Sequence, residues 1–237
     1  MNALSGALEQ LVDASRAWLK CVVGPIGVLN DMLPRANDER HISEATKIWI
    51  PSILVSLIVS LPVLNSYGIK WDNLGYHLFN WLVTILNLLM ASFLIHWFLI
   101  CFKLKSEFVR TFVIVTTPGM AYSPIMSLAV TPALFRMLDA LQAAKNAKQP
   151  FTMAFQYHYV TARLEQPGVL YVILNNSSLI LGMICFVLSA EAASQWYGND
   201  RLKTYLATTL ASLVGLIASM GAMMMQLWAM YSFMSAN

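Results

Sequence analysis

Long apolar segments alternate with short polar connections along most of the chain. Five of them are free or nearly free of charge, at residues 48–67, 77–102, 111–135, 168–190 and 205–233. Each reaches the roughly 20 residues with which a helix crosses about 30 Å of hydrocarbon. The pattern predicts an all-α fold, a polytopic membrane helical bundle of about five transmembrane segments within residues 48–237.

Residues 1–47 follow a different pattern. Apolar positions recur at helical spacing and charged positions lie largely opposite them; the apolar set is Leu4, Leu8, Leu11, Val12, Leu19 and Val22, and the charged set is Glu9, Asp13, Arg16 and Lys20. This predicts an N-terminal amphipathic helix, either lying on the membrane or packed against protein. Residues 24–47, with two prolines and mixed charges, are expected to form an aqueous linker.

The composition agrees with a membrane environment. Hydrophobic residues make up 58% of the chain and charged residues 11%, against about 25% charged in soluble domains. The formal net charge is +3, and the charges lie in short clusters between the apolar segments. The lipid bilayer is therefore the expected partner, and nucleic-acid binding has no support.

Lysine and arginine positions predict the orientation, because cytoplasmic loops retain basic residues. Five crossings place about ten of the basic residues inside and about five outside. A third segment that enters and leaves on the same side would give about twelve against three. We expect a cytoplasmic N-terminus in a bacterial inner membrane, and favour five crossings over the re-entrant alternative.

The third segment is the least regular of the five. It contains Pro118, Gly119, Pro124 and Pro132, and each proline removes a backbone donor and crowds the preceding turn. A broken backbone at membrane depth persists only where protein or water satisfies its polar groups. Whether residues 111–135 span or re-enter therefore decides the topology.

A family resemblance begins at His96. The stretch HWFLICFKLKSEFVRTFVIVTTPGMAYSPIM places a histidine near the end of one span, a short basic loop, an Arg-Thr-Phe helix start, and then Tyr122, Ser123 and Pro124. Upstream, GPIGVLNDMLP and IWIPSILVSLIVSLP form a proline-containing entry to the first span. This resembles the bacterial branch of the Yip-domain family over about residues 24–135. Two departures are Leu104 to Glu107 in place of a glycine pair, and a long connection at 136–167. The resemblance implies a five-helix fold with a cytoplasmic N-terminus.

Candidate catalytic chemistry is sparse. The histidines His41, His77, His96 and His158 are scattered, and no metal-binding spacing, phosphate loop or nucleophile motif accompanies them. We therefore expect no catalytic site, no metal site and no cofactor, and predict that the chain is not an enzyme. The spans also lack a central charged residue, which most ion-coupled carriers need.

Neutral polar side chains within the spans form the candidate intramembrane site. With His96 and Tyr122 they are Asn87, Thr116, Thr117, Asn175, Asn176 and Gln226. Such groups commonly hydrogen-bond between helices, and the alternative is a polar cavity or pore. In the last span, small residues recur every four positions at Ala207, Ala211, Gly215 and Ser219, which predicts close helix packing or self-association.

These observations favour a non-catalytic integral membrane scaffold or partner-binding subunit, Yip-like. We expect it to self-associate or to bind a membrane or cytoplasmic protein. The alternative is a homo-oligomeric channel or small-solute permease, lined by the neutral polar side chains of the spans.

Overall fold

The computed structural model describes residues 2–32, 38–70, 72–154, 156 and 169–234. Within these ranges the chain forms helices and no strand. They are α1 (Asn2–Val23), α2 (Pro25–Met32), α3 (Asp38–Ser66), α4 (Leu74–Cys101), α5 (Phe108–Asn146), α6 (Phe151–Met153), α8 (Val169–Tyr197) and α9 (Arg201–Phe233). The predicted all-α class is therefore confirmed.

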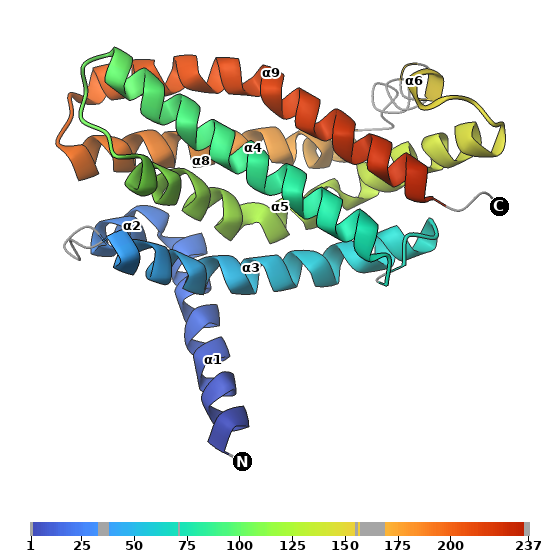
Figure 1. The fold of residues 1–237 in the computed structure, drawn as a ribbon, viewed down its shortest axis with the longest axis horizontal. Coiled ribbons are helices and arrows are strands. Elements are labelled where there is room, and N and C mark those ends of the chain that lie inside the picture. Colours follow the sequence, from blue (N-terminus) through green and yellow to red (C-terminus); the bar gives the residue numbers. More distant parts are fainter. Residues whose placement is uncertain (1, 33–37, 71, 155, 157–168, 235–237) are drawn as a thin grey trace.

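The long helices form one bundle whose members lie along a common direction (Figure 1). Helix α5 is central, since it packs against α1, α3, α4, α8 and α9. Four helices of the described chain are long and apolar enough to cross a membrane, at Ile42–Ser66, Leu74–Cys101, Ile180–Tyr197 and Arg201–Phe233. Their length and composition fit an integral membrane protein.

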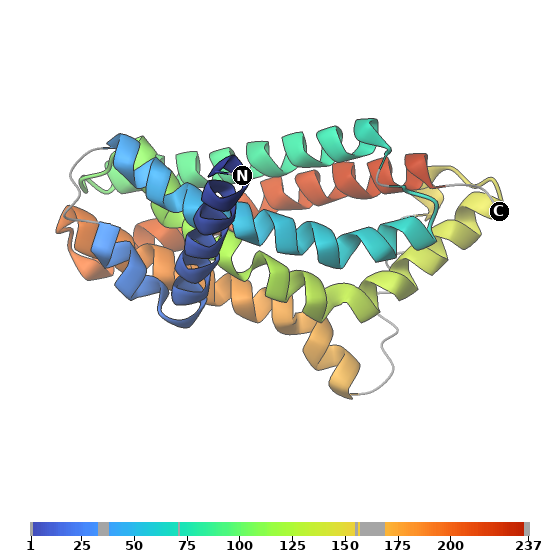
Figure 2. The ribbon, with the colours of Figure 1, turned by 90° about the horizontal axis from the view of Figure 1, so that it is seen from below.

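Helix α5 is not one of those four, and it is longer than the predicted segment 111–135. It runs without interruption over 39 residues and reaches from one end of the bundle to the other (Figures 1 and 2). A re-entrant segment would have to turn back, and the described α5 does not. A fifth crossing by α5 stays a prediction.

Pro124 should weaken α5, because it cannot donate to the carbonyl of Met120, four residues earlier. A neighbouring helix supplies the missing donor: the Ser52 hydroxyl of α3 donates to the Met120 carbonyl oxygen. On the next residue, the Trp18 indole Nε1 of α1 donates to the Ala121 carbonyl at 2.9 Å. Ser52 of α3 thus satisfies the carbonyl that the proline leaves free, and Trp18 of α1 binds beside it.

Pro118 leaves the Ile114 carbonyl without its helical donor in the same way. The Ser189 hydroxyl of α8 lies 3.4 Å from this oxygen and 2.8 Å from the Cys185 carbonyl, so the two carbonyls share its single proton. A side chain from another helix therefore lies at each of these two prolines of α5.

Left-handed residues end four of the helices. Gly68, Lys103, Lys148 and Gly198 have φ between 55° and 77°, and the amide that follows each one bonds back to the last helical turn. This ending allows a short connection between antiparallel helices. Lysine takes the place of glycine after α4 and α5, so the connection at Leu104 forms without the glycine pair of Yip-like sequences.

The N-terminal region differs from its expected form. Residues 25–32 form α2, with Pro25 in the first turn where no donor is lost, and α3 begins at Asp38. The expected linker at 24–47 is thus largely helical; its residues 33–37 lie outside the described chain. The C-terminal end of α1 packs on the bundle, while its N-terminal half stands away from it (Figure 1).

The partnership of Ser52 with Pro124 can be measured by a double-mutant cycle. We expect Ser52→Ala to lower the free energy of unfolding in detergent by about 1–3 kcal/mol, because a buried carbonyl loses its donor. In a Pro124→Ala background, residue 124 regains its N–H, and the cost of Ser52→Ala should fall by at least half. Ser66→Ala, which removes only a local bond to Val63, is the matched control. An equal cost in both backgrounds would contradict the assignment.

The topology can be tested by cysteine labelling. Lys105 and Ala147 are exposed residues just before and just after α5. In a background that lacks Cys21, Cys101 and Cys185, we expect Lys105→Cys and Ala147→Cys to react with a membrane-impermeant maleimide from opposite sides. Reaction of both from one side would show that α5 does not cross.

Candidate functional site

Two of the predicted polar residues join α4 to α9. Ser219 Oγ donates to Asn87 Oδ1 at 3.3 Å, and Gln226 Nε2 donates to Thr84 Oγ1 at 3.1 Å. Both bonds link one helix to the other at membrane depth, where an unpaired amide would be costly. The structure thus places Asn87 and Gln226 in contacts between helices.

The small-residue ridge of α9 lies inside the same chain. Ala207 and Ala211 are buried and pack with Ile95 and Leu99 of α4. A Cβ added at Gly215 would lie 3.6 Å from Leu94 Cδ1 of α4. The ridge lets α4 approach α9 closely, so self-association would have to use another surface.

His96 takes part in a polar cluster at the end of the bundle where α5 begins. Its Nδ1 lies 2.9 Å from Ser106 Oγ, which lies 3.0 Å from Thr111 Oγ1, which lies 2.9 Å from the hydroxyl of Tyr197. The imidazole also packs edge-on against Phe108, with ring centroids 5.9 Å apart. His96 thus connects α4, α5 and α8 through hydrogen bonds.

Tyr197 and Asn199 were not predicted, although they hold the turn between α4 and α5. The Tyr197 hydroxyl donates to the Glu107 carbonyl at 2.9 Å. The Asn199 Oδ1 accepts from the backbone amide of Lys105 at 2.9 Å, and the Asn199 Nδ2 donates to the Lys105 carbonyl at 2.8 Å. About 90 residues separate the partners in sequence, so no local sequence pattern predicts these contacts.

Lys145 has a comparable role at the opposite end. Its Nζ donates to the carbonyls of Tyr231 at 2.7 Å and Ser232 at 3.2 Å, and also to that of Met234. These are the carbonyls that the end of α9 leaves without helical partners. Burial lowers the pKa of the Lys145 ammonium. A basic residue expected in a loop is therefore the C-terminal cap of α9.

Close to Lys145 in sequence, Asp139 of α5 contacts the connection after α3. The Tyr67 hydroxyl donates to Asp139 Oδ1 at 2.6 Å. Burial, and secondly the hydrogen bond to this carboxylate, raise the pKa of Tyr67.

The remaining predicted residues do not converge. Thr116 donates to the Phe112 carbonyl at 2.6 Å, and Tyr122 to the Val22 carbonyl at the end of α1 at 3.0 Å. The buried hydroxyl of Thr117 has no hydrogen-bond partner among the described residues. Asn176 is exposed on α8, and the side chain of Asn175 lies outside the described part.

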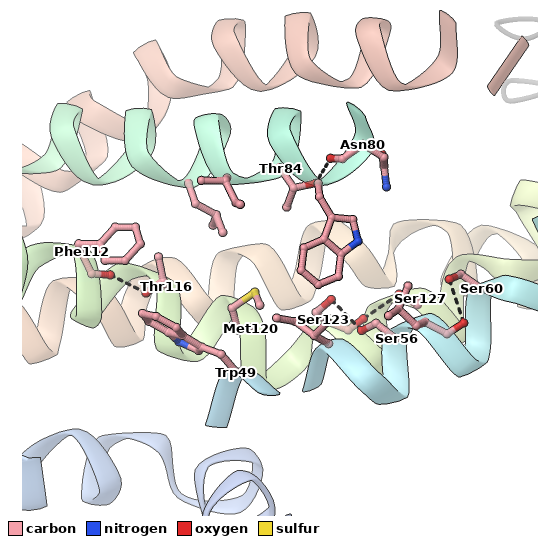
Figure 3. A pocket seen from close by; sticks show the side chains of 15 residues that line it. Trp49, Ser56, Ser60, Asn80, Thr84, Phe112, Thr116, Met120, Ser123 and Ser127 are labelled. Atoms are coloured by element: carbon pink, nitrogen blue, oxygen red, sulfur yellow. Dashed lines mark hydrogen bonds between the residues drawn. The ribbon is translucent and has the colours of Figure 1, made fainter. Parts of the chain in front are cut away.

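A lateral groove of about 500 Å³ lies between α3 and α4, with α5 as its floor (Figure 3). Of the predicted polar residues, Thr116 lines it. Three pairs of polar side chains spaced four residues apart also line it: Ser56 and Ser60, Asn80 and Thr84, and Ser123 and Ser127. Side chains four residues apart lie on one helix face, so this spacing could have identified the three pairs from the sequence.

No group of three or more His, Cys, Asp or Glu side chains that could hold a metal ion occurs among the residues that the structure describes. His158 lies outside them.

The cluster around Tyr197 predicts a difference between two tyrosines. Tyr197 is buried, whereas the hydroxyl of Tyr205 reaches Glu191 from a less buried position. We expect Tyr197→Phe to lower the free energy of unfolding by about 1–3 kcal/mol, because buried groups lose their partner, and Tyr205→Phe by about 1 kcal/mol or less. Thermal unfolding in one detergent compares the two, and an equal loss would contradict the cluster's importance.

No family model, curated protein or solved structure matches this chain. The resemblance to the Yip-domain family therefore remains a prediction from the short motifs in the sequence.

Proposed function

We propose that the chain is a non-catalytic integral membrane scaffold that binds a protein partner through α1. The observation that carries the proposal is the position of α1, a 22-residue helix that is fixed at its C-terminal end and projects from the bundle (Figure 1).

The fixed end of α1 is well attached. Trp18 donates to the Ala121 carbonyl, Tyr122 donates to the Val22 carbonyl, and Cys21 is fully buried. The projecting part exposes both kinds of side chain. Leu11 and Val12 are each more than 40% exposed, and the side chains of Asp13 and Arg16 are 75% and 72% exposed. Such a surface offers apolar contact area with charges that fix the orientation of a partner.

The position of α1 along the length of the bundle supports a location at the membrane boundary. Trp18 docks one residue from the carbonyl to which Ser52 donates, and Ser52 lies about 7 Å along α3 from its last charge, Lys47. Amphipathic helices commonly lie with their apolar face about 5–10 Å inside this boundary. We propose that α1 lies in the plane of the membrane on the cytoplasmic side, where the basic residues near the start of α3 and between α4 and α5 also belong.

The contacts between α4 and α9 weaken the channel alternative. Asn87 and Gln226 were candidates to line a pore, and each of them bonds to the other helix. A conducting path along these side chains would have to break those bonds. These contacts therefore favour the scaffold over the channel.

A photo-reactive amino acid at Leu11 tests the proposal in native membranes. We expect one protein adduct of defined mass, which Asp13→Arg weakens at least tenfold while the unfolding temperature stays unchanged, because Asp13 is exposed. The same probe at Leu213, an exposed residue of α9, should give lipid adducts. Lipid adducts alone at Leu11 would overturn partner binding.

The alternative function has its own readout. Liposomes that contain only this protein should show no ion or solute flux above protein-free liposomes. Ion or solute flux that Asn87→Leu or Gln226→Leu abolishes would show that the protein is a channel and would contradict the scaffold function.

A further inference from the structure

The groove between α3 and α4 is membrane-facing, because both of its walls belong to helices that are long and apolar enough to span. On the α4 wall, Trp81 and Ile85 are 40% and 48% exposed. No charged residue lines it. A molecule that enters must therefore come from the bilayer and present a neutral surface.

The length of the groove suits a lipid chain. The groove extends along α3 from Trp49 to Ser60, a rise of about 16 Å. Its volume is about 500 Å³, so an extended acyl chain fits along it.

Polarity changes along the groove. At one end the rings of Trp49 and Phe112 meet edge-to-face, with centroids 5.7 Å apart. The other end carries Ser60, Asn80 and Thr84 (Figure 3), near the connection between α3 and α4. Hydroxyl and amide side chains are therefore concentrated near that connection, where the polar end of an amphipathic lipid would lie with its chain towards the aromatic end. The buried Trp49 Nε1 at the aromatic end has no hydrogen-bond partner among the described residues.

The polar end has one group in need of a partner. The Ser60 hydroxyl already donates to the Leu57 carbonyl; that of Thr84 donates to the Asn80 carbonyl and accepts from Gln226. The side-chain amide of Asn80 makes no hydrogen bond to another described residue. An unpaired amide at bilayer depth is unfavourable, and a lipid ester carbonyl would accept from its Nδ2.

We propose that this groove binds one acyl chain of a membrane glycerolipid, with the ester carbonyl held by Asn80. The site is independent of α1, so the proposed function and the lipid site can fail separately.

The test uses the full chain, delipidated in detergent and then incubated with vesicles of phosphatidylethanolamine and phosphatidylglycerol. Native mass spectrometry should detect one retained lipid per chain. Ser60→Phe should reduce retention at least tenfold because the ring fills the groove. Asn80→Leu should reduce it several-fold, and a dialkyl ether analogue of the lipid should bind the unaltered chain as weakly as the ester lipid binds Asn80→Leu.

Ser212→Phe is the matched control, because Ser212 is an exposed serine of α9 outside the groove. It should retain lipid like the unaltered chain. Should Ser60→Phe not fold, Leu57→Trp fills the same groove, and the ether comparison needs no variant. Equal retention by all the variants, no retained lipid, or a protein adduct from a photo-reactive residue at Leu57 in native membranes would each overturn the proposal.

Discussion

The bundle depends on the backbone of α5 remaining helical through its prolines. A proline within a membrane helix leaves a carbonyl without its donor, and lipid cannot supply a substitute. Here Ser52 of α3 bonds to the carbonyl freed by Pro124, and Ser189 of α8 lies at the one freed by Pro118. The prolines therefore require neighbours on more than one side, and α5 consequently lies at the centre of the bundle.

This constraint explains features that otherwise look unrelated. Three threonines of α5, Thr111, Thr116 and Thr117, are buried among the neighbouring helices. The same helix forms the floor of the lateral groove, where its hydroxyls donate to its own carbonyls. Helix α1 also depends on it, since Trp18 and Tyr122 join the two. Helix α5 thus contacts α1 on one side and lines the groove on another.

Much of the fold could be predicted from the sequence, because long apolar segments leave few alternatives to membrane helices. The uninterrupted course of α5 could not, since it depends on a hydroxyl 68 residues away from Met120. The candidate site was predicted only in part. Polar residues in the spans were recognised, but Asn87 of α4 and Gln226 of α9 join these two helices. The groove is lined instead by serines, by Asn80 and Thr84, and by the predicted Thr116. Local spacing predicts which residues share a helix face, and it does not predict which helix that face meets.

Hydrogen–deuterium exchange of the α5 amides, measured on the protein in lipid nanodiscs, tests the central claim most directly. Local opening exposes amides to exchange, so protection reports the stability of each turn. An unbroken helix supported by its neighbours predicts slow exchange for the non-proline amides from Val113 to Ser127, including those between Pro118 and Pro124. Rapid exchange confined to residues 117–125 would show a broken helix and contradict the account.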